Sequence, residues 1–119
     1  MRKLTGKQAI GVHSPKQGHA VVIYTHKFKP EHYRKGLDII TRHFPDAQLD
    51  IKQKRLNIFL RRPSTHEVIN ITFFDERTSV HDWHEADARL KVVEKLRPML
   101  DGPIDVQVCE IERIVGVVK

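Results

Sequence analysis

The sequence predicts one α+β domain with a ferredoxin-like split βαβ fold, and three observations lead to this prediction. The chain has 119 residues, which is enough for a single modest core. Its content of 39% apolar and 30% charged residues is typical of globular proteins. Its apolar residues recur with the periods of strand, helix, strand, strand, helix and strand, in that order. We therefore expect an antiparallel four-stranded sheet with both helices on one face.

The first half of the predicted domain is a strand followed by a helix. Residues 19–28 are rich in β-branched side chains, which favours a strand. Pro30 suits the first turn of a helix, and Pro45 lacks the backbone N–H that a helix interior requires, so the helix is predicted to end there. Between these prolines, one apolar stripe at helical spacing is formed by Tyr33, Leu37, Ile40 and Phe44.

Two strands that form a hairpin are predicted next. Apolar residues alternate with polar ones over residues 47–51 and again, with the opposite parity, over residues 56–60. The change of parity indicates a bulge or a break near residues 54–55. Turn-forming residues at 62–66 then lead into a strand over 68–74, so the two strands are expected to pair as a hairpin.

A second helix and a last strand complete the predicted order. Thr78 or Ser79 can cap this helix. Its predicted buried stripe consists of Trp83, Ala86, Leu90 and Val93. The last strand begins near residue 104, and its apolar parity changes near residues 109–110, so we expect its end to leave its own sheet and reach a partner chain. Cys109, the only cysteine, is expected to be buried or half-buried in this strand.

Alternation along the strands predicts two different sheet faces. We expect Ile23, Ile69, Ile71 and Phe73 to point toward the helices. The uncovered face would then carry large, partly polar side chains, which are Tyr24, His26, Asn70, Thr72 and Phe74. Surfaces of this kind are rarely left open to water, so we expect two such faces to pair in a homodimer and to enclose a cavity.

Residues 68–74 (VINITFF), followed by an acidic helix-capping turn and by Trp83-His84, resemble the antibiotic biosynthesis monooxygenase domain of the dimeric α+β barrel superfamily. Gly102-Pro103 before the last strand adds to the resemblance, which spans about residues 19–115. The resemblance implies a homodimer. Some members of the family oxidise polycyclic aromatic substrates with O2 and without metal or flavin. This chemistry needs a group that helps to form a substrate anion, and a pocket poor in water.

Some positions of the family pattern are matched here and others are not. Asn70 matches the strand asparagine that such members place in their pocket. Phe74 stands where a Trp usually ends that strand, Val80 or His81 stands where a pocket tyrosine is expected, and Glu94 aligns with an expected arginine. These departures favour the alternative of a non-catalytic ligand-binding or assembly dimer on the same scaffold.

Haem-degrading relatives, which use an Asn, a Trp and a His ligand, are also similar to this chain, but the Asn and the His are missing here. They use an Asn on the first strand, where this chain has Tyr24, and a His ligand on the second helix. No His lies one to three turns beyond Trp83. We therefore do not expect haem degradation.

The predicted catalytic residues are His26, Tyr24 and Asn70. A histidine titrates near neutral pH and a tyrosine hydroxyl can hydrogen-bond an incipient anion, although both residues can also be satisfied interface residues. Asn70 lies in an otherwise β-branched strand, so its amide serves either a pocket or a hydrogen bond across the dimer interface. Thr72, Phe74 and Trp83 are predicted to contact the substrate.

The sequence gives no support for a cofactor or a metal. His81 and His84 have a spacing that could bind a metal, but both point away from the direction of Trp83 on a helix, which indicates a solvated face. The chain contains no zinc-protease, P-loop, dinucleotide-binding or serine-hydrolase motif. We therefore expect no flavin, haem or structural zinc.

Charge is concentrated at the start of the chain. Residues 1–18 form a basic leader with four basic residues and no acid, whereas residues 19–119, the predicted domain, carry 17 basic and 15 acidic residues. A basic leader can contact nucleic acid, so nucleic-acid binding is kept as a third hypothesis. No apolar run reaches the roughly 20 residues that a membrane span requires, and the start lacks a secretory signal. We expect a cytoplasmic protein.

Overall fold

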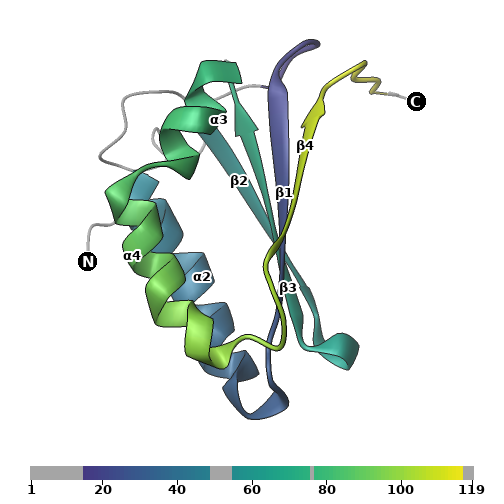
Figure 1. The fold of residues 1–119 in the computed structure, drawn as a ribbon. Helices are drawn as coiled ribbons and strands as arrows, with labels where there is room; N and C mark the ends of the chain where they lie inside the picture. Colours follow the sequence, from purple (N-terminus) through teal and green to yellow (C-terminus); the bar gives the residue numbers. More distant parts are fainter. Residues whose placement is uncertain (1–14, 49–54, 76, 117–119) are drawn as a thin grey trace.

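The computed structural model describes residues 15–48, 55–75 and 77–116. Its elements are β1 (Ala20–Lys27), α2 (Tyr33–Gln48), β2 (Arg55–Arg62), β3 (Glu67–Phe74), α3 (Arg77–His84), α4 (Asp87–Leu96) and β4 (Asp105–Glu110). The strands form one antiparallel sheet in the order β2-β3-β1-β4. Figure 1 shows that α2, α3 and α4 all lie on the same side of this sheet. The predicted α+β class with a ferredoxin-like, antiparallel sheet is confirmed.

The strand register defines which side chains share a sheet face, because directly paired residues of antiparallel strands point the same way. Tyr24 of β1 lies opposite Asn70 of β3 on one side and opposite Val106 of β4 on the other. Ile71 lies opposite Ile23 and Ile58, and these three belong to the other face. The central strands β1 and β3 therefore carry one face with polar groups and one aliphatic face.

The helices cover the face with polar groups. The sequence predicted that they cover the aliphatic face instead, so the predicted orientation of the sheet is wrong. Tyr24 belongs to the buried cluster that includes Phe44 of α2 and Trp83 of α3. The His26 ring lies 6.0 Å from that of Phe44. Alternation separates the two faces of a strand but does not decide which of them a helix covers. Here both faces carry large side chains, and the aromatic layer of the helices packs on the partly polar one.

The aliphatic face has no helix over it among the described residues (Figure 1). Ile58 and Leu60 of β2 are 41% and 45% exposed, and the aliphatic and aromatic residues next to them on this face are half-buried. These half-buried residues are Ile23, Leu56, Ile69, Ile71 and Phe73. The large uncovered surface that the sequence predicted therefore exists, but it is more apolar than expected.

The first helix does not end at Pro45. It continues to Gln48 with Pro45 inside its last turn. The proline removes one backbone N–H from the helix and crowds the carbonyl four residues earlier, and because it lies in the last turn only three helical residues follow the missing hydrogen bond. Ala47 is therefore helical and is not part of an alternating strand, and the predicted bulge at residues 54–55 lies partly outside the described residues.

The predicted second helix is two helices with a short break between them. α3 begins at Arg77, before both predicted cap residues, and ends at His84, and α4 begins at Asp87. The break changes the helical phase, so Leu90 is 42% exposed whereas Arg89 is only 6% exposed. The predicted stripe holds for Trp83, which is fully buried, and is wrong for Leu90.

The predicted hairpin is confirmed, because β2 and β3 pair along their whole length. All six residues of β4 pair with β1 of the same chain, and residues 111–116 after it belong to no strand. That this end of the chain reaches a partner stays a prediction. Every residue of β4 is exposed, including Cys109, which was expected to be at least half-buried. Within the described residues, no helix is long and apolar enough to cross a membrane.

Candidate functional site

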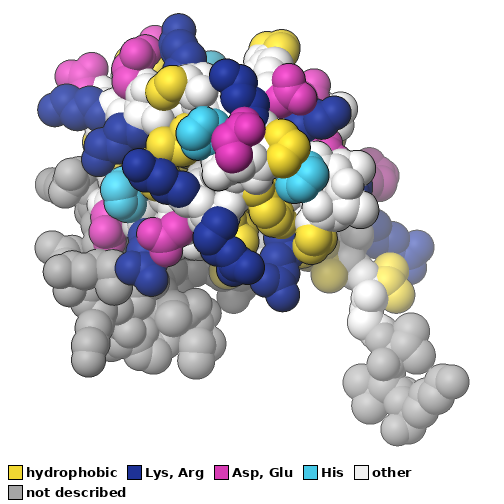
Figure 2. All heavy atoms as spheres, turned by 90° about the horizontal axis from the view of Figure 1, so that it is seen from below, with side chains coloured by type: hydrophobic (Ala, Val, Ile, Leu, Met, Phe, Trp, Pro, Cys, Tyr) yellow, Lys and Arg dark blue, Asp and Glu magenta, His cyan; other side chains and the backbone are white. Residues whose placement is uncertain are grey.

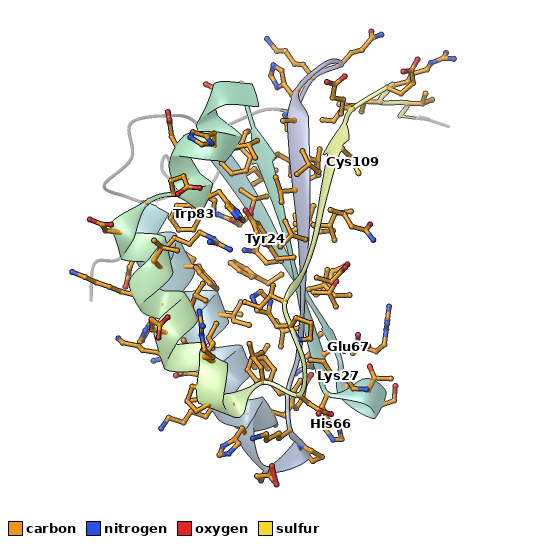
Figure 3. All side chains as sticks on the ribbon, viewed as in Figure 1. Tyr24, Lys27, His66, Glu67, Trp83 and Cys109 are labelled. Atoms are coloured by element: carbon orange, nitrogen blue, oxygen red, sulfur yellow. The ribbon has the colours of Figure 1, made fainter. Side chains whose placement is uncertain are left out.

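The six predicted site residues lie together between the sheet and the helices, on the inside of the domain. Figure 3 shows the Tyr24 side chain between the two layers, facing the helix that carries Trp83, whereas Cys109 points away from the helices. None of the six is more than 3% exposed, and they are Tyr24, His26, Asn70, Thr72, Phe74 and Trp83. The strands β1 and β3 are neighbours at the centre of the sheet, so they place four polar side chains in the most protected part of the core.

His26 is neutral at physiological pH. Burial lowers its pKa to about 4, the hydrogen bond to the backbone of Val68 opposes this shift, and the positive charge of Arg89 adds to it. The Nδ1 atom lies 3.4 Å from the Val68 carbonyl oxygen. A carbonyl oxygen only accepts hydrogen bonds, so Nδ1 carries the proton and Nε2 is left as the accepting nitrogen. His26 therefore does not titrate near neutral pH, contrary to what its residue type predicts.

Tyr24 lies against a buried cation. The guanidinium carbon of Arg89 is 5.4 Å from the centre of the Tyr24 ring, which is a cation–π distance. Burial raises the pKa of Tyr24 above its ordinary value, while the charge of Arg89 opposes this shift. The phenol therefore stays protonated at neutral pH. Its buried oxygen lies beside Arg89 and Trp83 but has no hydrogen-bond partner of normal geometry.

Asn70 and Thr72 form a small polar network on β3. The Thr72 hydroxyl lies 2.8 Å from the Asn57 Oδ1 atom and 3.3 Å from the Asn70 Oδ1 atom. Since a hydroxyl has a single hydrogen, it donates to one of these oxygens at a time. Contacts to Oδ1 leave the Asn70 amide hydrogens as donors. The network holds the amide of Asn70 in place beside Tyr24, its partner in the register.

Aromatic rings form the helix side of this compartment. Phe44 packs edge-on against Trp83 at 6.1 Å between ring centres. Phe74 is fully buried at the end of β3 in the same cluster. Edge-to-face packing of this kind gives a rigid apolar wall. The predicted substrate contacts Phe74 and Trp83 are thus brought together with the polar groups.

A pocket of about 300 Å³ lies next to the buried cluster, between α4 and the segment that leads into β4. Its lining is mostly apolar and consists of Val93, Arg97, Leu100, Gly102, Pro103 and Ile104. This volume is at the lower end of the range for small-molecule sites. Seen from below, the surface of the molecule has hydrophobic side chains exposed among charged and His side chains (Figure 2).

Arg89 is the site residue that sequence reasoning missed. The predicted stripe assumed one continuous helix from Trp83 onward, and that phase points Arg89 toward solvent. The Asp87 that begins α4 directly after Ala86 is the available signal for a new helix, because acidic residues are favoured in a first turn. By contrast, Glu94, which aligns with an expected arginine, is exposed and forms an ion pair with Arg97.

No protein-family model matches the chain, and no curated relative matches it. Solved structures do. Protein Rv0793 of Mycobacterium tuberculosis has a TM-score of 0.69 at 10% identity, over 82% of this chain and 99% of that chain. A Caulobacter crescentus protein provisionally assigned as an antibiotic biosynthesis monooxygenase has a TM-score of 0.70 at 11% identity, over 82% and 92%. A structure described as an antibiotic biosynthesis monooxygenase has a TM-score of 0.67 at 10% identity, over 79% and 99%. The chain has the fold of the antibiotic biosynthesis monooxygenase domain.

Proposed function

We propose that this protein is a homodimeric, monooxygenase-like protein that binds a small apolar or aromatic molecule, and that it oxidises this molecule with O2 without a cofactor. The observation that carries the proposal is the buried set of Tyr24, His26 and Asn70 in the centre of the domain. Buried polar groups cost stability unless they are fully satisfied, and Tyr24 keeps an unsatisfied hydroxyl there. The fold of the monooxygenase-like neighbours supports the same conclusion.

The proposed roles follow from the protonation states of these groups. Tyr24 stays protonated and donates a hydrogen bond to an oxygen of the substrate, and the Asn70 amide donates a second one. The accepting Nε2 atom of His26 orients a hydroxyl or an acidic C–H group of the substrate. A base with a pKa of about 4 removes protons poorly, so His26 acts mainly by positioning, and the donors stabilise the substrate anion that reacts with O2.

Anthrone, an enolisable tricyclic aromatic ketone, is a suitable test substrate. Its CH2 group becomes a carbonyl, one oxygen atom of O2 enters the product, and the other leaves as water with the two methylene hydrogens. We expect the purified protein to consume O2 and to form anthraquinone in a ratio of one to one. Tyr24→Phe and Asn70→Ala should lower kcat roughly 10- to 1000-fold, since each removes a hydrogen bond to the developing anion. Glu94→Gln, on the exposed face of α4, is the control.

The second candidate function is ligand binding without catalysis, and the low pKa of His26 favours it. Binding of anthrone that is abolished by Asn70→Ala, together with O2 consumption no faster than in buffer, would establish this alternative. Absence of both binding and turnover would contradict both candidates for this class of ligand.

We also propose that two copies pair through the aliphatic sheet face. This face is apolar across β2 and β3 and is bordered on β4 by Asp105 and Gln107, so it has the apolar centre and polar rim of a protein interface. A second copy presents the same surface, which suits a two-fold interface. Sedimentation velocity at micromolar concentration should give twice the mass of one chain.

Two variants with matched exposure test this interface. Ile58→Glu, at a position that is 41% exposed on the aliphatic face, should produce monomers, whereas Leu90→Glu, at a position that is 42% exposed on α4, should remain dimeric. A wild-type monomer, or a dimer that Ile58→Glu leaves intact, would contradict the proposed interface.

A further inference from the structure

Asn57 lies at the margin of the candidate site and takes no part in the proposed reaction itself. It belongs to β2, an edge strand of the sheet, and pairs directly with Thr72 of β3, so both side chains share the face that the helices cover. Thr72 and Asn70 are at most 2% exposed, whereas Asn57 is half-buried. These three side chains connect the centre of the buried compartment with the edge of the sheet.

The Thr72 hydroxyl serves two acceptors with one hydrogen. Its oxygen lies 2.8 Å from the Oδ1 atom of Asn57 and 3.3 Å from that of Asn70. Hydrogen bonds from a hydroxyl to an oxygen are usually about 2.7–2.8 Å long, so the contact to Asn57 has the better length. The two asparagines therefore compete for this hydrogen, and Asn57 holds it for more of the time.

The position of this hydrogen decides how the Asn70 amide is held. When it points to Asn70, the carbonyl of that residue is fixed toward Thr72, and its amide hydrogens are presented to a ligand. A carbonyl that accepts a hydrogen bond also polarises its own amide group, which strengthens the bonds that the amide hydrogens donate. When the hydrogen points to Asn57, two oxygen atoms face one another at 3.3 Å with no hydrogen between them, which weakens the hold on the amide.

We propose that Asn57 is a positioning residue for Asn70, because it competes for the Thr72 hydrogen and so limits how firmly the Asn70 amide is held as a donor to the ligand. The inference rests on the proposed role of Asn70 and deepens it. Thr72 transmits the effect from the edge of the sheet to its centre. The donor strength of a fully buried amide is thereby adjusted by a residue of an edge strand.

Two variants of Asn57 test the competition in anthrone oxidation. Asn57→Ala removes the competing acceptor, so the Thr72 hydrogen turns to Asn70, and we expect kcat to rise about three- to tenfold. KM should stay nearly the same, because the stronger donor stabilises the developing anion more than the bound substrate. Asn57→Asp places a charged, stronger acceptor at the same position and should lower kcat about tenfold or more.

A double-mutant cycle tests whether the Thr72 hydroxyl carries the effect. Thr72→Val removes the hydrogen with little change in shape, and in this background Asn57→Ala should change kcat less than about twofold. Any effect that Asn57→Asp keeps there is due to its charge alone. Thr72→Ser retains a hydroxyl and should preserve the wild-type response. Thr25→Val, the same substitution on the opposite face of the sheet, is the control and should leave kcat unchanged.

A spectroscopic measurement tests the same coupling without a ligand. The side-chain amide of Asn70 gives a pair of signals in a ¹H–¹⁵N spectrum, and their loss in Asn70→Ala assigns them. Asn57→Ala should shift this pair when Thr72 is present and leave it in place when Thr72→Val is also made. A purely structural role of Asn57 would shift the pair equally in both backgrounds.

Two outcomes would overturn the inference. One is an unchanged or lowered kcat in Asn57→Ala, and the other is an equal shift of the Asn70 signals with and without the Thr72 hydroxyl. Failure of the wild type to oxidise anthrone would contradict the proposed oxidation, and the Asn70 signals would then decide the inference alone. If Thr72→Val does not fold, Thr72→Ala takes its place in both measurements.

Discussion

His26 should make the stability of this protein depend on pH. Its pKa is about 4 in the folded state and 6.5 when unperturbed. Between these values the unfolded chain binds a proton at His26 and the folded chain does not, so the free energy of unfolding falls as the pH drops from 6.5 to 4. The difference between these two pKa values lowers the free energy of unfolding by about 3 kcal/mol once the pH has fallen to the folded-state pKa. Above pH 6.5 this contribution is constant.

The measurement is urea unfolding from pH 7 to pH 4 of the wild type and of His26→Gln. Glutamine keeps a donor for the Val68 carbonyl but does not titrate, and the carboxylates that titrate in the same range cancel in the difference between the two proteins. The wild type should lose about 3 kcal/mol more than the variant on acidification, and most of this loss should occur below pH 6. Parallel stability curves for the two proteins would refute the assignment of His26 as a buried, neutral histidine.

Two further predictions concern packing and are tested by urea unfolding at pH 7. Leu96→Ala should cost about 2–5 kcal/mol because Leu96 is fully buried, whereas Leu90→Ala at a 42% exposed position should cost less than about 1 kcal/mol; equal costs would contradict the helical phase of α4. Gly36→Ala should destabilise the protein by about 1–3 kcal/mol, since a Cβ atom there overlaps the buried Phe28 ring, and a gain in stability would show that the ring can move.

The order of the four strands, the hairpin and the presence of the six predicted residues on one side of the sheet could be predicted from the sequence, because period-two and helical patterns are local properties. The side of the sheet that holds the site could not. Ile23 and Tyr24 are both large enough for a core, and the choice between them depends on packing by helices that are distant in the sequence. The burial of Arg89 was missed for a similar reason, since the two-residue break before α4 fixes the rotation of that helix and leaves only a weak signal at Asp87.

The break between α3 and α4 also makes this site sensitive to insertions and deletions. Each residue added to or removed from Glu85–Ala86 would turn α4 by about 100° about its axis. One step would exchange the buried guanidinium of Arg89 for the side chain of Ala88 or of Leu90. A relative that differs by a single residue at this joint would therefore keep the same fold and the same strand residues, and yet lose the cation from its core.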